Sequence, residues 1–95
     1  MKMYVVVRKD ISRSQQAVQG GHALAELLIK KKVGWKNGKL IYLSQKNEED
    51  LVKLFKSVPT RNKAAFYEPY WNDSMTAFAA YGTKVSKFLR KLKLL

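Results

Sequence analysis

The order of apolar and polar positions along the chain predicts four strands. Met3 to Arg8 is a nearly continuous apolar, β-branched run, which favours a central strand buried on both faces. Lys39 to Gln45 predicts a second strand, with Leu40 and Tyr42 on one face and Ile41 and Leu43 on the other. Lys63 to Tyr67 and Met75 to Tyr81 predict a third and a fourth. The four predicted strands are enough to form one β-sheet.

Helix signals lie between and after these strands. Either Ser12 or Ser14 can cap a first helix that runs to about Lys31. Asn47, followed by acidic residues, predicts the start of a second helix. A last helix, with its apolar side toward the sheet, is expected to begin at Gly82-Thr83. The order β-α-β-α-β-β-α predicts an α/β fold with a mixed four-stranded sheet and helices on both faces.

The first helix carries two kinds of stripe. We expect its buried face to consist of the apolar positions at helical spacing, namely Ala17, Val18, Gly21, Leu24, Ala25, Leu28 and Ile29. A separate polar stripe contains Gln15, Gln19, His22 and Glu26. The pair Gly20-Gly21 costs about 1 kcal/mol of helix propensity per residue relative to Ala. This cost predicts that the sheet backbone or a ligand approaches closely there.

Composition narrows the class of protein. The 95 residues, of which 46% are hydrophobic, predict a single domain over residues 1–95. Nineteen Lys and Arg against seven Asp and Glu give a formal charge of +12, which favours a polyanionic partner. The absence of cysteine excludes a disulfide framework, a thiolate zinc site and a cysteine nucleophile, and a single histidine excludes a histidine cluster.

Hydropathy gives an expectation about location. No apolar run approaches the roughly 20 residues that a membrane span needs. The N-terminal apolar run is too short for the core of a signal peptide. We therefore expect a cytoplasmic protein that does not enter a membrane.

The candidate catalytic and ligand-binding residues lie near the ends of predicted strands. In open α/β sheets, ligands collect outside the carboxyl ends of parallel strands, here Arg8 to Gln15, and Arg13 favours an anion there. His22 joins such a site only if the polar stripe faces it, and otherwise packs between helix and sheet. Glu68 closes a strand, where a half-buried carboxylate can act as a general base or remain a charge in water.

Aromatic and basic residues point to RNA. Tyr70 and Trp71 follow Glu68, and such rings either hold single-stranded nucleotides or form a hydrophobic lid. The lysines Lys30 to Lys32, with the overall charge, predict a surface that contacts phosphates. A basic amphipathic helix also binds membranes, but we expect the last helix to cover the sheet.

Several segments together resemble the type II peptidyl-tRNA hydrolases. Residues 3–11 and Gln19-Gly20-Gly21-His22-Ala23 are similar to the family's Val-Val-Arg-x-Asp-Leu strand and its Ala-Ala-Gln-x-x-His-Ala helix. Trp35 to Ile41 and Asn47 to Leu54 resemble its second strand and second helix. The resemblance spans nearly the whole chain and is densest over Val5 to Ala23.

The chain departs from the family pattern in three places. Gln15 stands where the family has a lysine, and the loop before the first helix is two residues shorter. Glu68 stands for the aspartate of an Asp-Ala-Gly-Arg-Thr segment, and the route to Thr76 is shorter. The longer glutamate side chain moves the carboxylate unless the backbone compensates.

The resemblance implies hydrolysis of the ester that joins a peptide to the 3′ ribose of tRNA, with no metal or cofactor. His22 with Glu68 would deprotonate the water, Gln19 and Gln15 would hold the carbonyl and the oxyanion, and Thr76 would support them. The RNA-binding residues would be Arg8, Lys9, Arg13, Lys30, Lys31, Lys32, Tyr70 and Trp71. The partner would be tRNA, and formation of a homodimer is left open.

Two other interpretations remain from the sequence. The first is a noncatalytic RNA-binding protein of the same fold, which the glutamine at position 15 makes reasonable. The second is a small interaction protein whose basic face binds an acidic protein or an anionic membrane. Ester cleavage, salt-sensitive tRNA binding and vesicle binding distinguish the three.

Overall fold

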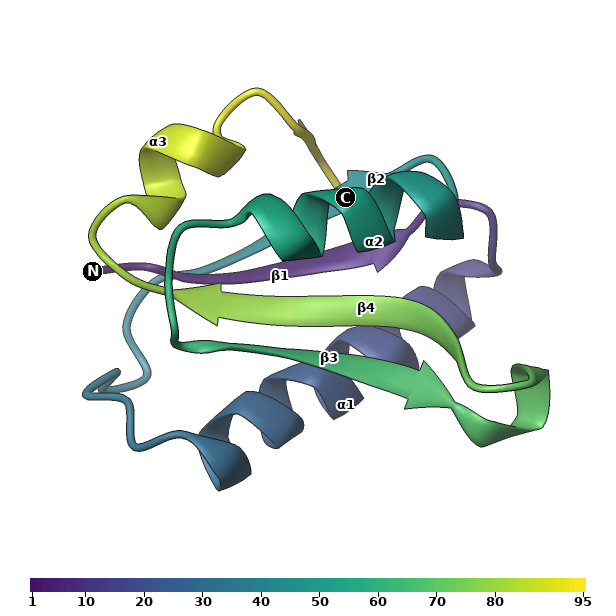
Figure 1. The fold of residues 1–95 in the computed structure, drawn as a ribbon, viewed down its shortest axis with the longest axis horizontal. Helices are drawn as coiled ribbons and strands as arrows, with labels where there is room; N and C mark the ends of the chain where they lie inside the picture. Colours follow the sequence, from purple (N-terminus) through teal and green to yellow (C-terminus); the bar gives the residue numbers. More distant parts are fainter.

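One mixed sheet organises the chain, and the computed structural model describes all 95 residues (Figure 1). In chain order the elements are β1 (Met3–Arg8), α1 (Arg13–Lys30), β2 (Leu40–Gln45), α2 (Glu48–Ser57), β3 (Lys63–Glu68), the 3-10 helix η1 (Pro69–Trp71), β4 (Ser74–Tyr81), α3 (Val85–Leu89) and β5 (Lys93–Leu94). The strand order is β3-β4-β1-β2-β5. β1 and β2 are parallel, β4 is antiparallel to β1 and β3, and β5 is antiparallel to β2. The predicted α/β class and mixed sheet are confirmed.

β1 is the central strand that its sequence predicted. Met3, Val5, Val6 and Val7 have no exposed surface, and Tyr4 is 5% exposed. Neighbouring strands pair with β1 on both edges, and helices cover both of its faces. A continuous apolar run suits this position because neither face of the strand meets water.

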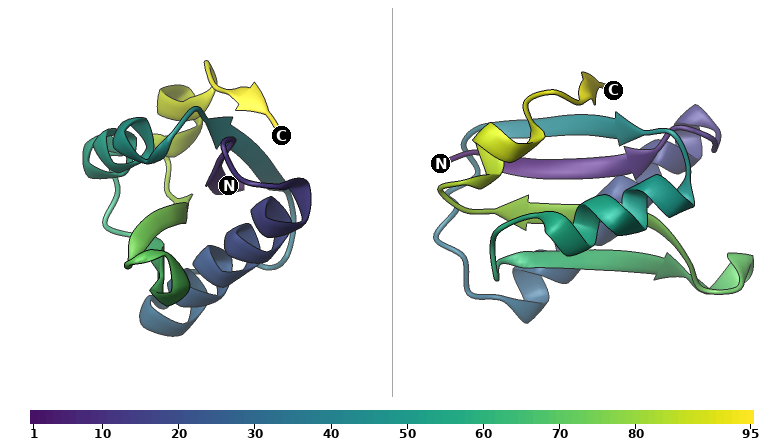
Figure 2. Two further views of the ribbon diagram at one scale, coloured as in Figure 1. Left: turned by 90° about the vertical axis from the view of Figure 1, so that its right-hand side faces the viewer. Right: turned by 45° about the horizontal axis from the view of Figure 1, so that its top comes forward.

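The core is divided by the sheet into two layers (Figure 2). On one face, Ala23 and Leu27 of α1 pack with Val5 of β1. On the other face, Leu51 of α2 and Leu89 of α3 belong to a cluster with Val6 of β1 and with Phe78 of β4. None of the helices combines the length and the apolar content that crossing a bilayer requires.

Local capping explains where the two main helices begin. The hydroxyl of Ser12 accepts a hydrogen bond from the Gln15 N–H at 3.3 Å, and the side chain of Asn47 accepts one from the Asp50 N–H at 2.9 Å. The end of α2 is held from β3, because the ammonium of Lys63 donates to carbonyl oxygens there. Burial lowers the pKa of Lys63.

The prediction of four strands and a longer last helix is wrong at the C-terminal end. α3 ends at Leu89, and the chain then adds a fifth strand, in which Lys93 pairs with Ser44 and Leu94 with Leu43. The N–H of Leu95 also donates to the backbone oxygen of Tyr42 at 3.1 Å. This pairing covers the edge of β2, whose backbone groups would otherwise lack strand partners on that side.

The predicted buried face of α1 is wrong at most of its positions, although Leu24 does pack partly buried against the core. The residues of α1 that are buried are Gln16, Gln19, Gly20, Ala23 and Leu27. Val18, Leu28 and Ile29, which were expected inside, are 48%, 45% and 80% exposed. The helix buries glutamines because their amides find hydrogen-bond partners, and no buried side-chain nitrogen or oxygen is left without one.

The close approach expected at Gly20-Gly21 occurs at Gly20. A Cβ atom built there would lie 2.5 Å from Cε2 of Tyr42, whereas Gly21 faces open space. The approaching group is therefore a side chain of β2 and not the sheet backbone. Gly20 lets the Tyr42 ring lie directly against α1.

Candidate functional site

Most of the candidate residues gather at one end of the sheet, on the right in Figure 1. β1 and β3 both end there, because each is antiparallel to β4, and α1 and β4 begin there. This is the edge at which ligands collect in open α/β sheets.

The side chain of Gln19 is the centre of a polar network at this edge. It has no exposed surface, and its Nε2 donates to Oε1 of Gln15 at 3.1 Å and to Oε1 of Glu68 at 3.3 Å. Its own Oε1 accepts a hydrogen bond from the hydroxyl of Thr76 at 2.8 Å. Because the carbonyl and the amino group both have partners, the orientation of the amide is fixed. We call these four residues, drawn from α1, β3 and β4, the glutamine network.

A β-bulge directs Thr76 toward α1. The pairing of β3 with β4 shifts register between Phe66 and Tyr67, and Thr76 is left without an opposite residue. Side chains of a regular strand alternate between faces, yet Thr76 and Ala77 both face α1. Without the bulge, the hydroxyl of Thr76 would face α2, away from the network.

Two charged side chains contact the backbone of this bulge. Glu48, at the start of α2, accepts a hydrogen bond from the N–H of Met75 at 2.6 Å. The guanidinium of Arg8 lies 3.5 Å from the Met75 carbonyl oxygen and 3.4 Å from the Ser74 hydroxyl. The position of Thr76 therefore depends on charges from β1 and α2.

Arg8 also forms an ion pair with Asp10 at 2.9 Å. The hydrogen bond between the two side chains raises the pKa of Arg8 and lowers the pKa of Asp10. Arg8 was predicted to hold RNA phosphates, but its side chain is only 17% exposed and each of its nitrogens contacts a protein acceptor. Its position is structural, and we remove it from the proposed RNA surface.

His22 lies beside the glutamine network without joining it. Its ring stacks on Phe66 of β3, with centroids 4.4 Å apart and planes 16° apart. The imidazole is exposed, so the alternative of a histidine enclosed between helix and sheet is wrong. No hydrogen bond or ion pair joins it to Glu68, although Phe66 and Glu68 are alternate residues of one strand.

Part of the network reaches solvent. Thr76 and Gln19 are fully buried, whereas Gln15 and Glu68 are half-buried. Oε2 of Glu68 and Nε2 of Gln15 make no hydrogen bond within the chain, so an acceptor and a donor are free to meet a ligand. No residue of the network lines any of the three principal pockets, so these groups meet solvent at an open surface.

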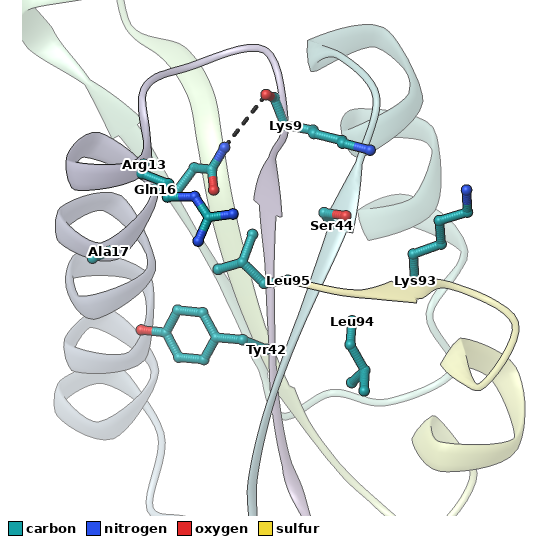
Figure 3. A pocket seen from close by; sticks show the side chains of 9 residues that line it. All are labelled: Lys9, Arg13, Gln16, Ala17, Tyr42, Ser44, Lys93, Leu94 and Leu95. Atoms are coloured by element: carbon teal, nitrogen blue, oxygen red, sulfur yellow. Dashed lines mark hydrogen bonds between the residues drawn. The ribbon is translucent and has the colours of Figure 1, made fainter.

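The largest pocket lies on the other flank of α1 (Figure 3). Its volume is about 730 Å³, and its walls are the start of α1, β2 and β5. The lining residues are Lys9, Arg13, Gln16, Ala17, Tyr42, Ser44, Lys93, Leu94 and Leu95. Two predicted RNA contacts, Lys9 and Arg13, thus face this pocket, which we call the cationic pocket.

The remaining predicted RNA contacts lie far apart. Lys30 to Lys32 are exposed at the end of α1, about 27 Å from its start at 1.5 Å per residue, and Lys30 pairs with Glu26 at 2.7 Å. Tyr70 and Trp71 are 91% and 37% exposed in η1, which directly follows Glu68 and projects beyond the sheet in Figure 1. The exposure of Tyr70 argues against a packed hydrophobic lid.

Sequence reasoning missed two contacts beside the network: Glu48 supports the bulge, and Phe66 stacks on His22. Glu48 was expected only as a charge at a helix start, and Phe66 only as a strand residue. Their roles depend on partners far along the chain, which no local pattern indicates.

No three His, Cys, Asp or Glu side chains are grouped as a metal ion requires. No protein-family model matches the chain, and no curated protein matches it.

Proposed function

We propose that the chain is an esterase of the peptidyl-tRNA hydrolase kind, which cleaves the ester between a peptide or an N-blocked aminoacyl group and the 3′ ribose of tRNA. The glutamine network carries this proposal. Gln15, Gln19, Glu68 and Thr76 stand at positions that the type II resemblance assigns to the site. They come from three elements and form one set of hydrogen bonds.

Glu68 is the proposed general base. Gln19 holds one oxygen of its carboxylate, and the other oxygen is free to accept a hydrogen bond from water. As the water oxygen attacks the ester carbonyl carbon, the carboxylate takes the proton of the water. Thr76 acts through Gln19, because its hydroxyl keeps the amide turned so that the NH₂ group faces Glu68.

Gln15 is the proposed donor to the oxyanion. Attack places negative charge on the ester carbonyl oxygen, which must be stabilised. The carbonyl of the Gln15 side chain already accepts from Gln19, so its NH₂ group is left to donate elsewhere. The positive end of α1, whose first turn contains Gln15, favours the same charge.

Collapse of the intermediate breaks the bond between the carbonyl carbon and the 3′ oxygen. The proton held by Glu68 passes to that oxygen, which yields a free peptide acid and a tRNA with a 3′ hydroxyl. We assign His22 to the ribose side of the site, because its exposed ring lies flat on Phe66 and has no bond to Glu68. Tyr70 and Trp71 would stack the terminal adenine beside the ester.

A noncatalytic tRNA-binding protein of the same fold is the second candidate. Two observations favour it: the family lysine is replaced by Gln15, and none of the three principal pockets lies at the network. Lys9, Arg13 and Lys30 to Lys32 would then contact phosphates along α1 without chemistry nearby.

The test follows ester cleavage of an N-acetylated aminoacyl-tRNA by the wild type and by variants. We expect Glu68→Gln to lower kcat/KM by about 10²- to 10⁴-fold, as loss of a general base does. Gln15→Leu should lower it by about 10²-fold, as loss of one oxyanion donor does. The matched control is Glu49→Gln, a change of the same charge at an exposed carboxylate on α2.

Two results would overturn the hydrolase proposal. Full activity of Glu68→Gln would show that the network is not the site. Absence of cleavage by the wild type, with tRNA binding that weakens steeply as salt is added, would establish the noncatalytic candidate, because counterion release sets that slope.

A further inference from the structure

Three cations meet at the cationic pocket. Lys9 reaches it from the loop after β1, Arg13 from the first turn of α1, and Lys93 from β5 (Figure 3). None of these side chains forms a salt bridge, and no Asp or Glu lines the pocket. Unpaired cations that share one space without an Asp or Glu favour an anion of more than one charge.

An adjoining hollow extends this positive surface. It has a volume of about 200 Å³, shares Lys9, Ser44 and Lys93 with the cationic pocket, and adds Lys46 and Lys91. No carboxylate lines it either. The two hollows together suit a short row of phosphates better than a single carboxylate.

Ser44 gives an independent sign of a polar ligand. Its side chain lies at the carboxyl end of β2, is only 9% exposed and lines both hollows. Its hydroxyl makes no hydrogen bond within the chain, whereas Thr76 and Ser12 both use theirs. Because every enclosed side-chain oxygen has a partner in the chain, this unbonded hydroxyl must open onto the hollows, where it is suited to donate to an anionic oxygen beside the cations.

Apart from Gln16, the remainder of the pocket lining is apolar or aromatic. Tyr42 and Leu94 lie away from the ammonium groups, and Leu95 projects between Tyr42 and Arg13 in Figure 3. Burial raises the pKa of Tyr42, whose ring presents a flat face beside α1. The volume lies within the range of about 300–1,000 Å³ that is typical of small-molecule sites. The pocket therefore offers a charged end and an end suited to a flat ring.

We propose that the cationic pocket binds a nucleotide through its terminal phosphates. Lys9, Arg13 and Lys93 hold the phosphates, Ser44 donates a hydrogen bond to them, and the base lies against Tyr42. The nucleotide is either free or the 5′-phosphorylated end of an RNA. The site is distinct from the glutamine network, and it does not rest on the proposed hydrolysis.

The test measures binding to the full chain by calorimetry and by amide NMR shifts at about 0.15 M salt, where distant charges are screened. The probes are ATP, adenosine, and two oligoribonucleotides that differ only in a 5′ phosphate or a 5′ hydroxyl. Binding of ATP identifies a free nucleotide, and a preference for the 5′ phosphate without binding of ATP identifies an RNA end. We expect adenosine to bind about tenfold more weakly than ATP, since it lacks the charged contacts.

Variants that remove the same charge inside and outside the cationic pocket distinguish binding at the pocket from general electrostatic attraction to the protein. Lys9→Ala and Arg13→Gln should weaken binding of the phosphorylated probe by about fivefold or more, because each removes a charged contact. Lys36→Ala and Arg61→Gln remove the same charges from exposed positions outside both hollows, and should change it by less than about twofold. Equal weakening by both sets, shifts that do not include Ser44 and Tyr42, or no saturable binding of any phosphorylated probe would overturn the proposal.

Discussion

The two flanks of α1 differ in whether their polar groups have hydrogen-bond partners within the chain. On one flank, Gln19 is buried and its amide bonds to partners from three directions. On the other flank, the residue Ser44 is only 9% exposed, but its hydroxyl opens on the pocket and bonds to nothing in the chain, and Arg13 has no carboxylate partner. The first flank lies under an open surface, and the second borders a pocket of about 730 Å³.

This difference distinguishes polar groups that position other side chains from polar groups that can bind a ligand. A buried polar group that is satisfied inside the protein stabilises the fold and fixes the direction of its neighbours. A polar group that opens on a pocket without a partner in the chain adds little to stability, and its hydrogen bond is available to a ligand. The satisfied flank therefore fits chemistry that needs oriented side chains, and the unsatisfied flank fits capture of an anion.

The largest expected effect follows from Thr76→Val. The substitution keeps the shape of the side chain but leaves the buried Oε1 of Gln19 without its donor. The free energy of unfolding should fall by about 1–3 kcal/mol. Urea denaturation measures it, with Thr83→Val, at an exposed position, as the control. A loss no greater than in the control would mean that the hydroxyl does not hold Gln19 in solution.

Glu48→Ala tests the support of the bulge. The matched variant is Glu49→Ala, because both residues lie in the first turn of α2 but only Glu48 bonds to the N–H of Met75. Glu48→Ala should cost about 1.5 kcal/mol more than Glu49→Ala, the lower range for a hydrogen bond to a charged group. Denaturation of the two variants gives the difference. Equal costs would remove Glu48 from the account of how Thr76 is placed.

Local signals predicted most of the fold. Ser12 and Asn47 cap the helices because capping depends on residues within one turn, and β1 was recognised because its whole run is apolar. β5 escaped prediction because two residues carry no period. It forms because β2 offers an unpaired edge, which is a property of the assembled sheet.

The spacing of apolar residues could not predict which face of α1 turns toward the sheet. Its outward side holds Val18, Leu28 and Ile29, a stronger apolar stripe than the buried one. Burial of Gln19 is possible only because Glu68 and Thr76 are brought to it from other strands. Four of the catalytic residues that the family resemblance supplied do meet, and His22 does not join them. The bulge that turns Thr76 toward this network is set by non-local pairing.

The two glycines of α1 provide an internally matched test of the pocket flank. Gly21→Ala, which adds a Cβ in open space, should stabilise the protein by up to about 1 kcal/mol through helix propensity. Gly20→Ala should lack this gain, because its Cβ must displace the Tyr42 ring, at a cost of about 1–3 kcal/mol if the ring moves little. Thermal denaturation compares them. Equal stabilisation by both would show that Tyr42 does not lie against α1.

Acid should affect the network flank through Asp10. Its pKa is lowered in the folded chain by the hydrogen bond from Arg8, so its contribution to stability is present above its unfolded pKa of about 3.9 and is lost as pH falls through the folded value. The stability difference between the wild type and Asp10→Asn should therefore shrink in acid, and it should be small throughout because the pair is partly exposed. Urea unfolding of both proteins at pH 7 and at about pH 2 measures it. A difference that persists in acid would contradict the pairing.

Ser44→Ala should have the smallest effect on stability. Removal of a hydroxyl that opens on a pocket and has no partner in the chain forfeits no internal hydrogen bond, so the free energy of unfolding should stay within about 0.5 kcal/mol. Urea denaturation beside Thr76→Val makes the comparison directly, because both variants lose the hydroxyl of a largely buried residue and differ in whether that hydroxyl was bonded within the chain. A loss as large as that of Thr76→Val would mean that Ser44 is satisfied within the protein, and the two flanks of α1 would then be alike.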